Sequence, residues 1–160
     1  MYTINMHIFF KYSLIEELKN IIDLLTHKNK YANLRSVIYP SLLKFITSSK
    51  IQKRRIVQIQ KVWEKIEPQF GDFLFKQDLY LEVSKIVCYV HTFGCEGWFD
   101  IDKNEIHVRT EESSLKNTID SIMHETIHLP TYTSEATYKE REDLVEKYMQ
   151  MKQIQELLVI

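Results

Sequence analysis

The sequence predicts an α+β fold, and three observations support this prediction. Apolar residues recur at helical spacing through residues 14–66 and again from residue 115 to the end of the chain. Between these regions the residues are largely aromatic and β-branched, as in strands. Only three glycines and three prolines interrupt the 160 residues, so long regular elements should dominate. We expect a single domain over residues 1–160, mainly helical in residues 1–70 and mixed in residues 71–160.

Four short strands are expected. Residues 2–10 and the run Lys85 to Thr92 (KIVCYVHT) have the composition of strands, and the second of them should be buried. Residues 98–101 and 105–108 then form two strands joined by Asp102-Lys103-Asn104, a tight polar turn. Three of the four strands therefore lie in the middle of the chain, before the most informative motif.

Five helices are expected from the apolar periodicity and from residues that cap or break helices. They span residues 14–25, after the capping-box sequence Ser13-Leu14-Ile15-Glu16; about 32–47, with a bend or break near Pro40; about 50–66, closed by Pro68 and Gly71; about 114–129, capped by Ser113 or Ser114; and about 134 to the C-terminus. The fourth of these helices carries the motif on which the functional prediction depends.

The composition excludes several classes of protein. With 44% hydrophobic and 27% charged residues and a formal net charge of -1, the chain is not disordered, and it is not basic enough to bind nucleic acid through bulk charge. Residues 1–10 lack the basic leader and the uninterrupted apolar stretch of a signal peptide, and the longest apolar runs are too short to cross a bilayer. We therefore expect a soluble protein without a membrane partner, either cytoplasmic or exported without a conventional N-terminal signal.

The chemistry is carried by His124-Glu125-Thr126-Ile127-His128, the pattern H-E-x-x-H on a predicted helix. Two histidines four residues apart lie one turn apart on the same helix face, so both imidazoles can present a nitrogen to one metal ion. Glu125 then lies beside the ion, where it can take a proton from the attacking water. The alternative is that both histidines are ordinary core or surface residues. It is disfavoured by the apolar residues around the motif, which suit a helix buried in a domain: Ile119, Ile122, Met123, Ile127 and Leu129.

A catalytic zinc ion needs a third protein ligand and one open position. No histidine follows His128, so the candidates are the carboxylates of the last predicted helix: Glu135, Glu140, Glu142, Asp143 and Glu146. At about 100° per residue, Glu142 shares the apolar face with Val145, and a buried carboxylate needs a partner such as a metal ion. We therefore predict Glu142 as the third ligand. The alternative is a surface ion pair of Glu142 with Lys139 or Lys147.

The motif and the carboxylates that follow it resemble the gluzincin group of zinc peptidases, in which H-E-x-x-H is followed by E-x-x-x-D on a second helix. His124 to His128 match the first part, and Glu142-Asp143-Leu144-Val145-Glu146 matches the second, with Glu146 standing where the pattern has an aspartate. The resemblance covers about Trp98 to Met149. It implies N-terminal helices packed on a minimal zincin-like unit of short β-strands, an active-site helix and a C-terminal glutamate helix.

By the same resemblance the protein is a zinc-dependent metallopeptidase, an endopeptidase rather than an exopeptidase. Zn2+ is expected on His124, His128 and Glu142, with Glu125 as the general base. Glu146, one turn after Glu142, is expected to accept the second ring N–H of a ligand histidine. The partner implied is a peptide or protein substrate.

In zincins a small sheet lies above the active-site helix, and its edge strand binds an extended peptide by strand addition. The strand predicted directly before the helix supplies the candidate edge residues Glu105, Ile106, His107, Val108 and Arg109. The candidate stabilisers of an oxyanion are His107, Tyr132 and Tyr138. For each of these three, the alternative is an ordinary packing role.

Two other functions stay open. One is a catalytically inactive zincin-like or helical domain that acts as a protein-interaction module. The other is nucleic-acid binding by a basic cluster that comprises Lys50, Lys53, Arg54 and Arg55. Because Glu64 and Glu67 follow this cluster and an amphipathic helix needs a charged outer face in any case, we favour a solvated helix face and expect no nucleic-acid partner.

Overall fold

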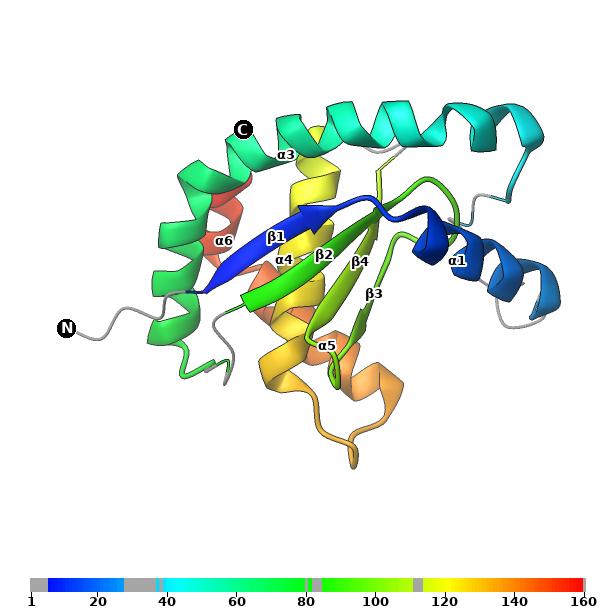
Figure 1. The fold of residues 1–160 in the computed structure, drawn as a ribbon. Helices are drawn as coiled ribbons and strands as arrows, with labels where there is room; N and C mark the ends of the chain where they lie inside the picture. Colours follow the sequence, from blue (N-terminus) through cyan, green and yellow to red (C-terminus); the bar gives the residue numbers. More distant parts are fainter. Residues whose placement is uncertain are drawn as a thin grey trace.

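The computed structural model describes residues 6–27, 37, 39–79, 81, 85–110 and 114–159, and its fold is α+β, as predicted. One mixed sheet contains β1 (His7–Lys11), β2 (Lys85–His91), β3 (Gly97–Asp100) and β4 (Glu105–Arg109). The helices are α1 (Leu14–Thr26), α3 (Leu42–Lys76), α4 (Leu115–Thr131), α5 (Tyr138–Met149) and α6 (Lys152–Leu157) (Figure 1). None of these helices combines the length and the apolar character needed to span a membrane.

The sheet has the order β1-β2-β4-β3, so β4 is an interior strand and β3 forms one edge. β1, β2 and β4 run parallel, and β3 pairs antiparallel with β4 through a turn that includes Asn104 at a φ of 54°. Residues 106–109 of β4 are buried on both faces of the sheet, as in an interior strand. The prediction that Glu105 to Arg109 is the edge strand is therefore wrong, because the preceding strand of the hairpin occupies the edge.

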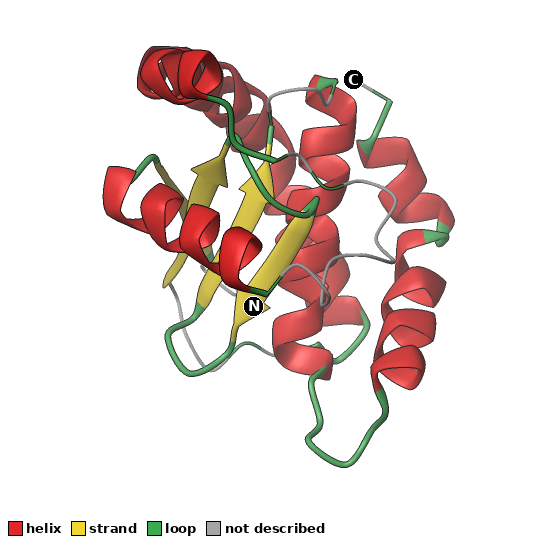
Figure 2. Cartoon of the chain, turned by 90° about the vertical axis from the view of Figure 1, so that its right-hand side faces the viewer, coloured by secondary structure: helices red, strands yellow, loops and turns green. Residues whose placement is uncertain are grey.

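The two faces of the sheet are covered differently, and Figure 2 shows α1 in front of the sheet and α4 behind it. Behind the sheet, α3 and α4 pack with the strands around large buried side chains, among them Trp63, Phe70, Ile86, Ile106, Ile119 and Ile122. In α1, only Glu17 and Leu24 are buried. α1 is therefore held by a few specific contacts and not by a large apolar interface.

α3 is one continuous helix, whereas two helices are expected over about 32–47 and 50–66. It begins after Ser41, and residues 32–36 and 38 lie outside the described part of the chain. The hydroxyls of Thr47 and Ser48 donate to carbonyls of the preceding turn, at 3.1 and 2.8 Å. These bonds satisfy the polar side chains within the helix, so this polar stretch does not interrupt it.

Pro68 and Gly71 do not end α3, contrary to prediction. Buried Ile66 and Phe70 flank Pro68, so core packing continues on both sides of it. α3 bends in the C-terminal half that contains the proline (Figure 1), as expected where a backbone N–H is missing. The last predicted helix is also corrected, since the structure has α5 and α6 in its place, and α5 begins only after Thr137.

A buried glutamate holds α1 on the sheet. Glu17 is fully buried, and its carboxylate accepts hydrogen bonds from Nδ1 of His91 at 2.9 Å and from the N–H of Thr92 at 3.0 Å. An imidazole that donates to Glu17 through Nδ1 can accept through Nε2, and Nδ1 of His107 lies 2.8 Å from that nitrogen. Because a buried carboxylate is costly unless it is hydrogen-bonded, these bonds fix the position of α1 across the sheet.

His107 is buried on this same face of the sheet, where its ring stacks on that of Trp98. Burial lowers the pKa of His107 to about 3, and the neighbouring His91 adds to this effect. The ionisable groups around it are His91 and Tyr89 on β2, Asp100 on β3, Lys103 in the turn, Glu105 on β4 and Lys19 on α1. His107 is therefore a neutral imidazole at pH 7.

We predict that mild acid destabilises the fold through His107. The His107 imidazole is protonated near pH 6.5 in the unfolded chain but only near pH 3 in the folded chain. The contribution of neutral His107 to the free energy of unfolding is therefore complete above about pH 6.5 and is lost as the pH falls. Between pH 7 and pH 5 this group should lower the free energy of unfolding by about 2 kcal/mol. His107→Phe keeps a ring beneath Trp98 but does not titrate. In denaturant titrations, its free energy of unfolding should therefore fall between pH 7 and pH 5 by about 2 kcal/mol less than that of the unsubstituted protein. Equal pH dependence in the two proteins would contradict the prediction.

Candidate metal centre

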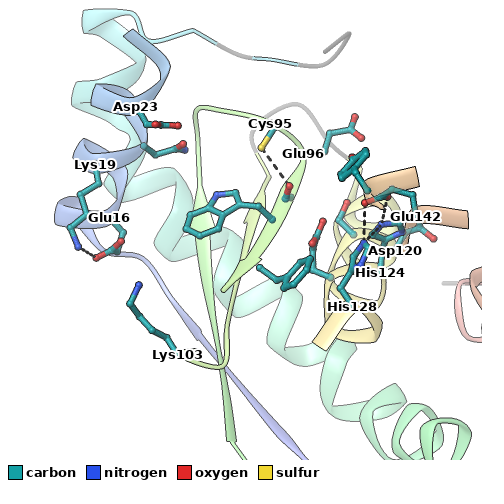
Figure 3. A pocket seen from close by; sticks show the side chains of 17 residues that line it. Glu16, Lys19, Asp23, Cys95, Glu96, Lys103, Asp120, His124, His128 and Glu142 are labelled. Carbon is teal, nitrogen blue, oxygen red and sulfur yellow. Dashed lines mark hydrogen bonds and ion pairs between the residues drawn. The ribbon is translucent and has the colours of Figure 1, made fainter. Parts of the chain in front are cut away.

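α4 presents two histidines toward α5, next to the edge strand β3. The helix begins after Ser114, whose Oγ accepts from the N–H of Asn117 at 3.0 Å. Its opposite flank is buried in the core through Ile119, Ile122, Met123 and Ile127. With these residues packed on the strands, His124 and His128 lie next to α5 (Figure 3).

α5 is oriented by its first turn and by its buried face. Thr137 and Glu140 form a capping box, in which Oγ1 of Thr137 accepts from the N–H of Glu140 at 3.3 Å and the Glu140 carboxylate accepts from the N–H of Thr137 at 2.7 Å. Val145 and Met149 are buried, and Glu142 lies on the same side of the helix, toward α4. The cap therefore uses Glu140, and the inward face carries Glu142.

Three donor atoms converge between α4 and α5 (Figure 3). Nε2 of His128 lies 3.1 Å from Nε2 of His124, and the two Glu142 carboxylate oxygens face them, with Oε2 3.3 Å from Nε2 of His124 and Oε1 3.3 Å from Nε2 of His128. Over the described part of the chain, no other group of three side chains is arranged to hold a metal ion. The structure thus brings together the three residues that the sequence predicts as ligands.

The donor set fits a zinc ion. Tetrahedral zinc, bound at about 2.0–2.1 Å to nitrogen or oxygen, places neighbouring ligand atoms about 3.3 Å apart. The two imidazole nitrogens, 3.1 Å apart, are close to this spacing, and each lies 3.3 Å from one oxygen of the Glu142 carboxylate. Two imidazoles and one carboxylate also leave a fourth position for water or substrate, as in catalytic zinc sites.

The charges of the cluster suit a cation as well. Hydrogen bonds from His124 and His128 lower the pKa of Glu142 far below its usual value, so the carboxylate is an anion at neutral pH. Burial disfavours protonation of His124, yet the bond to Glu142 and the charges of Glu125 and Asp120 outweigh it and raise the His124 pKa. The Glu142 anion thus lies against both imidazoles, and a metal ion bound there would neutralise its charge.

Glu146 lies away from the ligand histidines, unlike the predicted arrangement. Its carboxylate accepts from Nε2 of Gln150 at 2.9 Å on the exposed side of α5. Nδ1 of His128 is buried and has no hydrogen-bond partner among the described residues. The ring of His128 instead stacks on Phe99 of β3, with centroids 4.8 Å apart and planes at 13°. Aromatic stacking, and not a carboxylate, therefore fixes the plane of this imidazole.

Glu125 is buried beside the cluster and against the edge strand. Burial raises the pKa of its carboxyl to about 8, although His124 opposes the shift. The carboxylate packs directly on Gly97 of β3, where a Cβ atom would lie only 2.4 Å from Oε1 of Glu125. A residue without a side chain is therefore needed on β3 at the point where Glu125 meets it.

A cleft of about 1020 Å3 extends from α1 across the open edge of β3 to α4 and α5. Figure 3 shows its two walls: on one side Glu16, Lys19 and Asp23 of α1, and on the other Asp120, His124, His128 and Glu142. Trp98 and Phe99 of β3 also line it. The candidate metal site therefore opens into a groove that includes the outer edge of β3, which pairs with no strand other than β4 in the described part of the chain.

Of the three candidate oxyanion stabilisers, Tyr138 alone is among the lining residues of the cleft. Burial and the neighbouring Glu142 raise the pKa of its hydroxyl. Tyr132 packs edge-on against Phe99 and under the guanidinium of Arg141. His107 lies on the other face of the sheet, toward α1, so the prediction that it lines the catalytic side is wrong: strand alternation points it away from α4.

Most residues that line the cleft were not predicted as site residues, and four of them are close to the ligand cluster or to the strand edge: Gly97, Trp98, Phe99 and Asp120. Asp120 precedes His124 by four residues, so helical periodicity places it on the same face, and this signal is present in the sequence. The other three are in β3, and their importance depends on which strand of the hairpin occupies the edge.

Comparisons with known proteins identify no relative. No protein-family model matches the chain, and searches of curated proteins and of solved structures find no significant match. The interpretation of the site therefore depends on its motif and its geometry.

We predict that the purified chain binds about one zinc ion. Substitution of a residue that only hydrogen-bonds to a metal ligand typically weakens metal affinity by roughly 10–100-fold. Removal of a ligand itself, in His128→Ala or Glu142→Gln, should weaken zinc binding by more than this. Glu146→Gln is the matched control, since it makes the same chemical change one turn further along α5 and should keep the metal. Elemental analysis and competition with a chelating dye measure these differences. A natural protein that binds no zinc after incubation with the metal would refute the assignment.

The contact of Glu125 with Gly97 generates a separate prediction. Gly97→Ala should lower the free energy of unfolding by about 1–3 kcal/mol, because the added methyl group forces the buried carboxylate to move. In a Glu125→Ala background the same substitution should cost clearly less. Denaturant titrations of the four proteins of this double-mutant cycle measure the coupling. Costs that are equal in both backgrounds would show that Gly97 is needed for another reason.

Proposed function

We propose that the protein is a zinc-dependent peptidase of zincin-like architecture, in which His124, His128 and Glu142 hold the metal and Glu125 is the general base. The observation that carries the proposal is the convergence of two imidazole nitrogens and a carboxylate at 3.1–3.3 Å, beside a buried glutamate and facing a free strand edge. An antiparallel edge strand beside the helix that bears H-E-x-x-H supports the zincin-like interpretation.

The roles of the residues follow from their positions. A bound zinc ion supplies Lewis acidity, which makes water a stronger acid and polarises the scissile carbonyl. In its ionised form, which a cation bound nearby would favour by lowering the Glu125 pKa, Glu125 accepts the proton that the attacking water releases and then delivers it to the nitrogen of the leaving amine. Burial against Gly97 holds the Glu125 carboxylate in one place and keeps bulk water from it. Tyr138, next to Glu142 in the cleft, is the candidate donor to the oxyanion.

The free edge of β3 supports a peptide substrate bound in extended form. Strand addition uses backbone hydrogen bonds and requires neither terminus of the bound chain. This mode of binding therefore favours an endopeptidase. Because Gly97 and Phe99 of β3 are in contact with Glu125 and His128, a peptide on this edge would pass directly beside the proposed metal.

We predict that Glu125→Gln retains zinc and loses peptide hydrolysis by at least about 10²-fold, the lower range for removal of a general base. The amide is close in shape to the carboxylate but accepts no proton. Cleavage of a fluorogenic peptide library, measured beside the zinc content of the same sample, separates the two effects. Asp143→Asn, on the exposed side of α5, is the control and should keep both zinc and activity. A Glu125→Gln protein with full activity would exclude the mechanism.

A further inference from the structure

We propose that the cleft selects peptides with an arginine, whose side chain lies against Trp98 in a subsite between β3 and α1, on the opposite side of the strand from the metal cluster. The proposal rests on the proposed function, because it assumes a peptide substrate that binds in extended form along β3. The supporting observations are the backbone direction of β3, the fixed position of Trp98 and the charge of the α1 wall.

The open edge of β3 determines which side chains of a bound peptide reach each wall. The N–H of Arg109 donates to the carbonyl of Glu96. Hydrogen-bonded pairs alternate in an antiparallel ladder, so the backbone groups of Trp98 point to β4, and those of Gly97 and Phe99 point to the open edge. A peptide paired on this edge therefore places its residue opposite Trp98 on the α1 side and the two neighbouring residues on the side of the metal cluster.

Trp98 offers a fixed aromatic surface to that residue. Its ring stacks on the ring of buried His107, with centroids 3.4 Å apart and planes at 9°, and His107 is hydrogen-bonded to His91. Trp98 is nevertheless 38% exposed and lines the cleft. One face of the indole is thus held by a buried imidazole while other ring atoms remain accessible. An indole face attracts cations and stacks well on the planar guanidinium of arginine.

The charge of the cleft favours a cation over an anion at this position. Among the described residues that line it, six carry carboxyl groups, of which Glu125 is mainly protonated at pH 7, and two are lysines. Both lysines have carboxylate partners, Lys19 with Glu16 at 2.7 Å and Lys103 with Asp100 at 2.5 Å. Figure 3 shows Glu16 and Asp23 along the α1 wall. The positive charge of a guanidinium between this wall and Trp98 would be complementary to the carboxylates of the wall, whereas an acidic side chain would be repelled by them.

The test measures binding without turnover. Glu125→Gln protein is titrated with fluorescein-labelled peptides of the form acetyl-Ala-Ala-Xaa-Ala-Ala, where Xaa is arginine, its neutral isostere citrulline, or glutamate. At low salt the arginine peptide should bind at least about tenfold more tightly than the glutamate peptide, with citrulline between them, and about 0.5 M salt should reduce the difference. Unlabelled arginine peptide should also change the tryptophan emission, because Trp98 is exposed and the other tryptophan, Trp63, is buried.

Variants locate the selectivity. Trp98→Leu, and separately Glu16→Gln combined with Asp23→Asn, should each remove most of the preference for arginine, whereas Asp143→Asn should leave it unchanged. Equal affinity for the three peptides, no measurable binding, or a preference that survives both sets of cleft substitutions would overturn the subsite.

The outcome is separable from that of the proposed function. The preference for arginine should persist in His128→Ala, since the subsite contains no metal ligand. Persistence in a protein that neither binds zinc nor cleaves peptides would refute the peptidase alone. Zinc-dependent cleavage without selectivity for arginine would refute the subsite alone.

Discussion

The architecture of the cleft depends on the alternation of side chains along β3. Gly97 and Phe99 face α4, where the first leaves room for Glu125 and the second stacks on His128. Trp98 faces the other way and stacks on His107, its partner in the β3–β4 pairing. A slip of one residue would exchange the two faces and place an indole where the Glu125 carboxylate lies. The register of one short hairpin therefore sets the surroundings of both the candidate base and a candidate ligand.

α1 contributes the second wall of the cleft, and polar contacts hold it in place. The buried Glu17 carboxylate accepts bonds from β2 and from the loop that follows, and Asn20 donates to the carbonyl of Phe93 at 2.6 Å. That loop approaches α1 closely because Gly94, at a φ of 102°, has no Cβ to collide with the Asn20 side chain. Removal of Glu17 would leave buried donors unsatisfied, so α1 has one strongly favoured position.

Local sequence signals predict the local parts of this structure. Spacing within α4 places His124 and His128 together, and the apolar face of α5 selects Glu142 among five carboxylates, because helical periodicity is a property of neighbouring residues. Strand order, in contrast, is a property of the whole chain. β4 lies between β2 and β3, which makes β3 the edge strand. No pattern within the strand sequences predicts this order. The continuity of α3 through Pro68 is also non-local, since it depends on the core on both sides. Glu146 accepts a hydrogen bond from exposed Gln150 and not from a ligand histidine, so helical periodicity alone does not place a residue at the border of a helix face.

The ligand cluster is organised by elements that are stable for other reasons. Ser114 caps α4 and apolar packing fixes its rotation, while a capping box and buried Val145 do the same for α5. The donor atoms of His124, His128 and Glu142 therefore lie at metal-ligand spacing as a consequence of helix packing. A site held on rigid helices loses little conformational freedom when a cation binds, which favours affinity. The same acidic surroundings that attract a metal ion also extend along the cleft to α1, so a single excess of negative charge accounts for both the proposed cofactor and the proposed preference for a basic side chain.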